Sequence, residues 1–272
     1  MIDSHVHLNR REFEGQADLV VVRAKQEGVT GFLNVGYDLI SSRESIALAE
    51  GDPAILATVG IHPHDALMLA DEQGQLTSEG EQALEELTKM SAHPRVVAIG
   101  EIGLDYFRDL SPRPAQHAAL AAQLSLADKV GLPVVFHVRD AWPETLEQID
   151  RCGVPQKGGV LHSFSGDEET VAWARERGFL LGIGGPVTYK NSKLPGLVAA
   201  AGVDMILLET DAPWLPPVPY RGQRNESAYL AHTLAKVAEI LDMDPAEVDR
   251  RTTESFKALF GDPDVPSVRS IP

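Results

Sequence analysis

Apolar residues recur along the chain in short runs rich in β-branched side chains, spaced roughly 20 to 40 residues apart and separated by amphipathic stretches. A run such as Pro133-Val134-Val135-Phe136 leaves no polar face for solvent, which is typical of a strand buried on both faces of a parallel sheet. Eight such runs are predicted as strands: residues 2–7, 29–36, 55–62, 96–105, 133–138, 159–164, 179–185 and 205–211.

The stretches between these runs carry helical periodicity. Helices are predicted for residues 17–27, 81–90, 115–130 and 168–177, and two more, 226–241 and 245–260, follow the last strand. Gly28, Gly131 and Gly178 each come directly after a predicted helix, where glycine readily adopts the left-handed conformation that ends one. The repeating unit is therefore a strand followed by a helix.

Eight such units predict an α/β protein, a single-domain (β/α)8 TIM barrel spanning residues 1–261. An open doubly wound sheet is the alternative, because a strand count cannot prove that the first and last strands pair. Residues 262–272, which include three prolines, are expected to form a flexible tail.

Composition narrows the class of protein. The chain has 272 residues, of which 43% are hydrophobic, enough for one sizeable core. A single cysteine excludes an internal disulfide, and neither a leader pattern nor a long apolar run is present, so we expect a cytoplasmic protein with no membrane partner. The oligomeric state is not indicated, and a monomer is compatible. The net charge of −16 repels polyanions, so a nucleic-acid substrate requires local positive charge.

The unusual polar residues fall at the carboxyl ends of the predicted strands, which is the active-site end of a TIM barrel. His5 and His7 lie two apart on the first strand, so the two-residue period of a strand turns both imidazoles to one side. Glu209 and Asp211 have the same spacing on the eighth strand, the neighbour of the first in a closed barrel. These residues predict four potential metal ligands at one seam.

Glu101, His137 and His162 end the fourth, fifth and sixth strands. One such histidine alone is more often hydrogen-bonded into the core than bound to a metal, but burying several beside carboxylates is costly unless a cation unites them. Mixed imidazole and carboxylate ligands suit zinc or manganese, and also accept magnesium. A divalent ion there favours hydrolysis. The glycines at 182, 184 and 185 lack the dinucleotide-binding spacing and predict a closely packed seventh strand instead.

The rim of the predicted barrel carries further candidates. Binding of substrate phosphate is predicted for Arg139, Lys190, Arg221 and Arg108, with a solvated surface loop as the alternative for Arg221. Three more residues are predicted either to act at the site or to pack behind the metal ligands: Glu209, His62 and His64. The run Asp105-Tyr106-Phe107-Arg108 is expected to pack at the rim, with an aromatic ring placed near a base as the alternative.

Six motifs together resemble the TatD family of metal-dependent deoxyribonucleases. In chain order they are Asp3-Ser4-His5-Val6-His7-Leu8, Gly60-Ile61-His62-Pro63-His64, Gly100-Glu101-Ile102-Gly103-Leu104-Asp105, His137-Val138-Arg139, His162-Ser163-Phe164-Ser165-Gly166 and Leu208-Glu209-Thr210-Asp211-Ala212-Pro213. They occur in the family's order and cover nearly the whole chain. The first would fit any amidohydrolase-like barrel, whereas the last two are much more specific.

The resemblance implies a site with two divalent metal ions, Mg²⁺, Mn²⁺ or Zn²⁺. One ion would be held by His5, His7 and Asp211 and the other by His137 and His162, with Glu101 bridging them. The sequence departs from the family at Asn9, where aspartate is common, and at Ser227, where proline is usual. Neither position is a proposed ligand, but the second lies near the predicted substrate loop.

These observations predict a divalent-metal-dependent phosphodiesterase, a deoxyribonuclease that cleaves DNA or an oligonucleotide with a metal-activated water. Asp211 is the predicted catalytic proton acceptor, and Glu101 the bridging residue. The alternative is a metal-dependent amide or ester hydrolase acting on a small metabolite or an aminoacylated nucleotide, since a fold does not decide the reaction. A non-catalytic metal-binding protein would be indicated by a missing ligand, and none of the six is missing.

Overall fold

A computed structural model describes residues 1–263, and in it eight parallel strands form one sheet in the order in which they follow along the chain. The strands are β1 (Ile2–Val6), β2 (Gly31–Asn34), β3 (Ile55–Val59), β4 (Val96–Asp105), β5 (Val134–Arg139), β6 (Gly159–Leu161), β7 (Leu180–Ile183) and β8 (Ile206–Leu208).

The sheet closes on itself just beyond β8. Val6 and Ala212 form a parallel bridge there, and the amide of Asp211 donates to the carbonyl of His5 over 2.9 Å. The carboxylate of Asp3 joins the same seam, because it accepts hydrogen bonds from the amide of Thr210 (2.9 Å) and from its hydroxyl (2.6 Å). The predicted barrel is confirmed, and the open doubly wound sheet is wrong.

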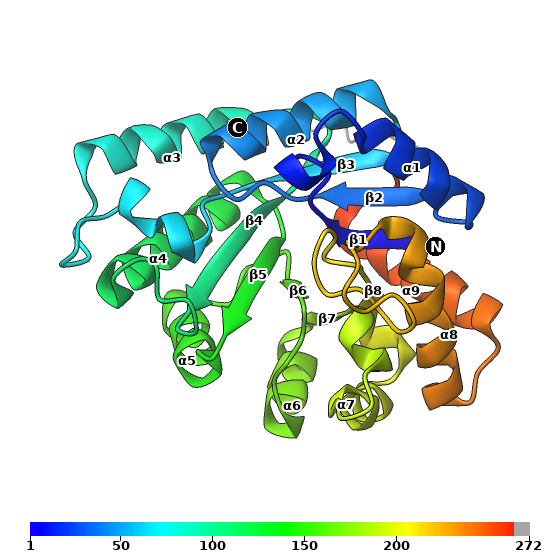
Figure 1. Cartoon of the computed structure of the whole chain (residues 1–272). Coiled ribbons are helices and arrows are strands. Elements are labelled where there is room, and N and C mark those ends of the chain that lie inside the picture. The colour runs from blue at the N-terminus through cyan, green and yellow to red at the C-terminus, as the bar shows by residue number, and fades with distance from the viewer. Residues whose placement is uncertain (264–272) are drawn as a thin grey trace.

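Helices surround the ring of strands (Figure 1). They are α1 (Ala17–Gln26), α2 (Leu39–Gly51), α3 (Ser78–Ser91), α4 (Arg113–Val130), α5 (Trp142–Cys152), α6 (Glu168–Arg177), α7 (Leu194–Ala201), α8 (Leu230–Leu241) and α9 (Pro245–Phe260). As predicted, Gly131 and Gly178 end α4 and α6 in the left-handed conformation, with φ of 66° and 71°. Within residues 1–263, no helix combines the length and apolar character needed to cross a bilayer.

Apolar side chains fill the barrel from its amino-terminal end. Nearly every strand contributes one to an inner cluster, and Phe256 and Phe260 of α9 are buried against it. Such burial contributes on the order of 25 cal/mol per Å² of apolar surface. This end of the barrel is a packed core, so the polar residues gather at the carboxyl end.

Several strands end earlier than the sequence predicts. The predicted segment 205–211 leaves the ladder after Leu208, and Asp211 has a φ of 55°, a left-handed conformation that cannot continue a strand. Helix α8 begins at Leu230 and not at 226, because Glu226 is extended and its carboxylate accepts a hydrogen bond from Arg23 of α1 over 2.7 Å. Most of the expected tail, residues 264–272, lies outside the described residues.

Candidate metal centre

The predicted ligands meet at the carboxyl ends of the strands. A cavity of about 950 Å³ opens there, and its lining includes His7, Glu101, His137, His162 and Asp211. His5 lies fully buried beside them, with its Nε2 atom 3.1 Å from Nε2 of His7. All six residues that the sequence nominated as metal ligands are therefore neighbours in space.

The first group of ligands lies at the seam between β1 and β8. Nε2 of His5 and Nε2 of His7 are 3.9 and 3.6 Å from Oδ1 of Asp211. Burial lowers the pKa of His5 to about 4 and that of His7 to about 3, so both rings are neutral at pH 7 and offer lone pairs. Two nitrogens and a carboxylate oxygen thus converge on one point.

Glu101 lies between this group and a second one. Its Oε2 is 3.6 Å from Nε2 of His5 and 3.7 Å from Nε2 of His7. Its Oε1 is 2.7 Å from Nδ1 of His137 and 3.1 Å from Nε2 of His162. The two oxygens of one carboxylate face two separate pairs of histidines, which is the arrangement that a bridging ligand needs.

The second pair of histidines lies beside carboxylates that raise the pKa of both rings. Burial lowers the pKa of His162, but the carboxylates of Glu101 and Glu209 outweigh burial and raise this pKa well above its ordinary value. Hydrogen bonds to Asp105 and Glu101 likewise outweigh burial and raise the pKa of His137. Three groups of side chains here have ligand atoms close enough to hold a cation: His5, His7 and Asp211; His62, Glu101 and His137; and His5, His162 and Glu209. Buried nitrogens beside carboxylate oxygens fit divalent ions, because a cation would balance the charge of the carboxylates.

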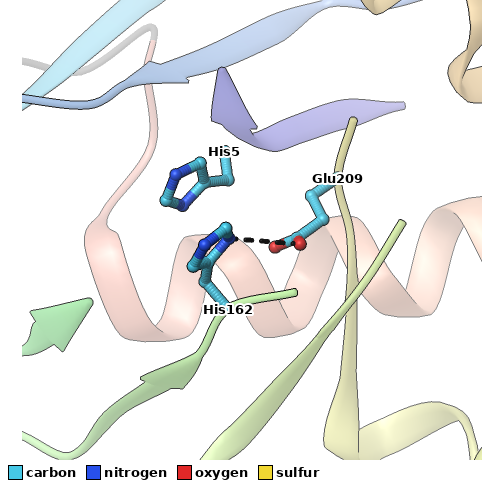
Figure 2. A group of neighbouring side chains, drawn as sticks. All are labelled: His5, His162 and Glu209. Atoms are coloured by element: carbon cyan, nitrogen blue, oxygen red, sulfur yellow. Dashed lines mark ion pairs between the residues drawn. The ribbon is translucent and has the colours of Figure 1, made fainter. Parts of the chain in front are cut away.

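Glu209 fixes His162 from behind. Oε1 of Glu209 is 3.4 Å from Nδ1 of His162 and accepts a hydrogen bond from the amide of Ser163 over 2.7 Å. Figure 2 shows Glu209 beside the ring of His162 and the ring of His5 over its face. The centroids of the two stacked rings are 3.6 Å apart. A carboxylate on the remote nitrogen of a ligand histidine sets the orientation of the ring and its basicity.

Gly182 of β7 makes room for this carboxylate, and Gly185, just after β7, makes room for the main chain at Leu215. A Cβ atom on Gly182 would lie 2.1 Å from Oε2 of Glu209, and one on Gly185 would lie 2.2 Å from the carbonyl oxygen of Leu215. The glycine-rich stretch is thus required by close packing, as the sequence predicts.

Asp105, the first residue of the run predicted to pack at the rim, hydrogen-bonds to two histidines of the site. Its Oδ2 accepts hydrogen bonds from Nε2 of His137 (3.0 Å) and from Nε2 of His64 (2.8 Å). Its Oδ1 accepts from the amides of Phe107 and Arg108, and the carboxylate is almost fully buried. Asp105 lies four residues after Glu101 on the same strand, and this even spacing was the signal that places both on one face.

His62 lies against the same cluster. Its Nδ1 accepts a hydrogen bond from the amide of His64 over 3.1 Å, so a neutral ring carries its proton on Nε2, which is 3.7 Å from Oε1 of Glu101. Burial lowers the pKa of His62 well below its ordinary value and keeps the ring neutral. This tautomer is suited to donate a hydrogen bond into the site more than to bind a cation.

The predicted phosphate-binding residues divide into two pairs. Arg108 and Arg139 line the cavity, whereas Lys190 and Arg221 are absent from its lining, and Arg221 packs over the ring of Tyr189 at 4.3 Å. A role in binding phosphate stays a prediction for all four. Sequence reasoning missed three basic residues that line the same cavity: Arg10, Arg11 and Lys193.

Comparisons with known proteins agree with this geometry. The uncharacterized metal-dependent hydrolase YabD of Bacillus subtilis is 36% identical over 261 residues, which cover 96% of this chain and 98% of the relative. The 3′-5′ ssDNA/RNA exonuclease TatD of Citrobacter rodentium is 35% identical over 267 residues, with 96% and 98% covered.

The structural comparison points the same way. The crystal structure of YjjV, a TatD homologue from Escherichia coli K12, matches with a TM-score of 0.85 at 30% identity and covers 96% of this chain and 97% of that one. The family model described as TatD related DNase matches residues 2–261. This chain therefore belongs to the family of TatD-related DNases.

Proposed function

We propose that this protein is a divalent-metal-dependent phosphodiesterase that cleaves DNA or oligonucleotides. The observation that carries the proposal is the position of Glu101, whose two carboxylate oxygens each face a different pair of histidines. When bound, two divalent ions lower the pKa of water toward neutrality and balance negative charge on the oxygens of a phosphodiester.

The residues of the site would have two kinds of role, metal binding and proton transfer or hydrogen bonding to substrate. One ion would be bound by His5, His7 and Asp211, and the other ion by His137 and His162. Glu101 would bind both ions. Asp211 would accept a proton from water with the carboxylate oxygen that the ion leaves free. His62 points its Nε2–H group toward the same cavity and can donate a hydrogen bond to a substrate oxygen there.

Two observations support a nucleic-acid substrate. Arg108 and Arg139 line the cavity and supply positive charge that the chain as a whole lacks. The relative from Citrobacter rodentium is named as an exonuclease of single-stranded DNA and RNA. An amide or ester hydrolase has no observation of its own in its favour. Location in the cytoplasm and a monomeric state stay predictions.

The test is single-turnover cleavage of a labelled oligonucleotide at saturating metal. Asp211→Asn keeps the volume of the side chain but removes its basicity, and loss of a general base typically lowers the rate about 10²- to 10⁴-fold. The matched control is Asp242→Asn, because Asp242 has a similar left-handed φ of 50° at the end of α8, outside the cavity lining. Near-wild-type cleavage by Asp211→Asn would refute the role of Asp211.

A further inference from the structure

One arginine at the rim of the cavity lies between two aromatic rings. The Cζ atom of Arg10 is 4.9 Å from the ring centroid of Tyr37 and 5.1 Å from that of Trp214. The ring of His7, a predicted metal ligand, stands edge-on to both, at centroid distances of 5.8 and 5.1 Å. All four residues line the cavity. Tyr37 and Trp214 contact both Arg10 and His7, so Arg10 lies close to the predicted metal centre.

The guanidinium of Arg10 can donate a further hydrogen bond. Its Nε is buried and has no hydrogen-bond partner among the described residues. The carboxylate of Glu12 lies 3.8 Å from Nε, too far for a hydrogen bond. Tyr37 and Trp214 flank the guanidinium, and the side chain of Tyr37 also takes a hydrogen bond from it. The Nε–H group is left for an acceptor that enters the cavity. Phosphate oxygens are the acceptors that this planar group of donors matches best.

Trp214 offers a rigid aromatic surface at the same place. It is 39% exposed, whereas Trp142 and Trp173 pack against phenylalanine rings. Its amide donates to the carbonyl of Asp211 over 2.9 Å, and its carbonyl accepts from the side chain of Asn225 over 2.6 Å. A large ring that is partly exposed yet fixed in this way is suited to stack on an unpaired base.

We propose that Arg10 and Trp214 form a nucleotide subsite for single-stranded nucleic acid, in which Arg10 binds a phosphate adjacent to the one that is cleaved and Trp214 stacks on its base. This inference rests on the proposed phosphodiesterase function and assigns two residues that would position its substrate. A duplex cannot use the subsite in this way, since its bases are already paired and stacked.

The opposite side of the mouth repeats the arrangement. In a closed ring of eight strands β5 stands across from β1, and Arg139 at the end of β5 lies 4.0 Å from the ring centroid of Phe107, which is 58% exposed. A single strand that crosses the metal centre therefore meets an arginine beside an aromatic ring on each side. This symmetry supports a path for the strand from Arg10 to Arg139.

The first arm of the test measures binding of a labelled single-stranded thymidine oligonucleotide with phosphorothioate linkages to the metal-loaded protein. We expect R10A to raise Kd roughly tenfold, as for a charge-assisted hydrogen bond, and to reduce the slope of log K against log salt by about 0.7, the value for one phosphate of a single strand. R10K should recover only part of this affinity, because an ammonium does not stack between rings. R151A is the matched control, since Arg151 is exposed on α5 and is absent from the lining of the cavity.

The second arm concerns Trp214. W214A should weaken binding of the single strand roughly 5- to 150-fold, the range for one stacked base, with little change for a duplex, and W214F should retain most of the affinity. Metal content is measured for each variant because Trp214 contacts His7. Unchanged Kd and salt slope in R10A and W214A, in a wild type that cleaves oligonucleotides, would overturn the subsite alone. A wild type that neither binds nor cleaves them would overturn the proposed function as well.

Discussion

Replacing Gly182 by alanine tests whether the carboxylate behind His162 matters to the metal centre. The new Cβ atom would lie 2.1 Å from Oε2 and 2.7 Å from Cδ of Glu209, and 3.0 Å from Cα of His162. Glu209 is 1% exposed, and the amide of Ser163 donates to its carboxylate. The end of this side chain cannot move into solvent, so it must give up either that hydrogen bond or its approach to His162.

The magnitude follows from these contacts. Forcing a methyl group into a packed site destabilises a protein by about 1–3 kcal/mol. For a domain of this size that lowers Tm by roughly 2 to 12 °C, at about 2–4 °C per kcal/mol. Displacing the carboxylate that orients a ligand histidine typically weakens metal binding about 10- to 100-fold.

The assay compares melting curves and metal titrations of Gly182→Ala and Gly196→Ala. Gly196 lies in α7, where an added Cβ atom meets nothing within 4 Å, so alanine there should stabilise the helix by up to about 1 kcal/mol. Glu209→Gln serves as a second comparison, because it keeps the shape of the side chain while removing its charge. A Gly182→Ala protein with wild-type Tm and metal affinity would show that Glu209 does not hold His162.

Two further predictions concern the metal. The variants His137→Ala and His162→Ala should keep the fold but lose both bound metal and oligonucleotide cleavage. The control is His93→Ala, which removes a contact with Glu50 away from the cavity and should leave metal content and cleavage unchanged. Metal analysis, the cleavage assay and circular dichroism test these outcomes. In the cation-free site the pKa of His162 is raised and that of Asp211 is about 7, so both hold protons near pH 6 that a cation must displace. Metal affinity should therefore rise from pH 6 to pH 8, with release of at least roughly one proton in titration calorimetry, and a pH-independent affinity would contradict this reasoning.

The barrel was predictable because its signals are local. Each strand is a short apolar run, and its helix ends at a glycine such as Gly131 or Gly178, so the alternation of units is visible in the sequence alone. The strand ends were less predictable. His62 and Asp211 continue the apolar runs in sequence, but in space the chain has already left the ladder to form the rim.

The ligand residues were predictable for a different reason. Polar residues are unusual within buried apolar strands. His5, Glu101 and His162 can therefore be recognised in the sequence as candidate ligands. Arg10 and Trp214 do not, since an arginine and a tryptophan in loops are ordinary. Their importance depends on a contact between segments separated by about two hundred residues, and no pattern within one segment reveals it.

Closure of the barrel and assembly of the site depend on one network of buried polar groups. Asp3 accepts two hydrogen bonds from Thr210, and the side chain of Asn225 donates to the carbonyls of Thr210 and Trp214, over 2.8 and 2.6 Å. Between Thr210 and Trp214 lies Asp211, which is held in its left-handed conformation with its amide bound to His5. The contacts that join β8 to β1 therefore also place a metal ligand and the aromatic surface of the proposed subsite. A change that loosens this seam should reduce stability, metal binding and oligonucleotide binding together.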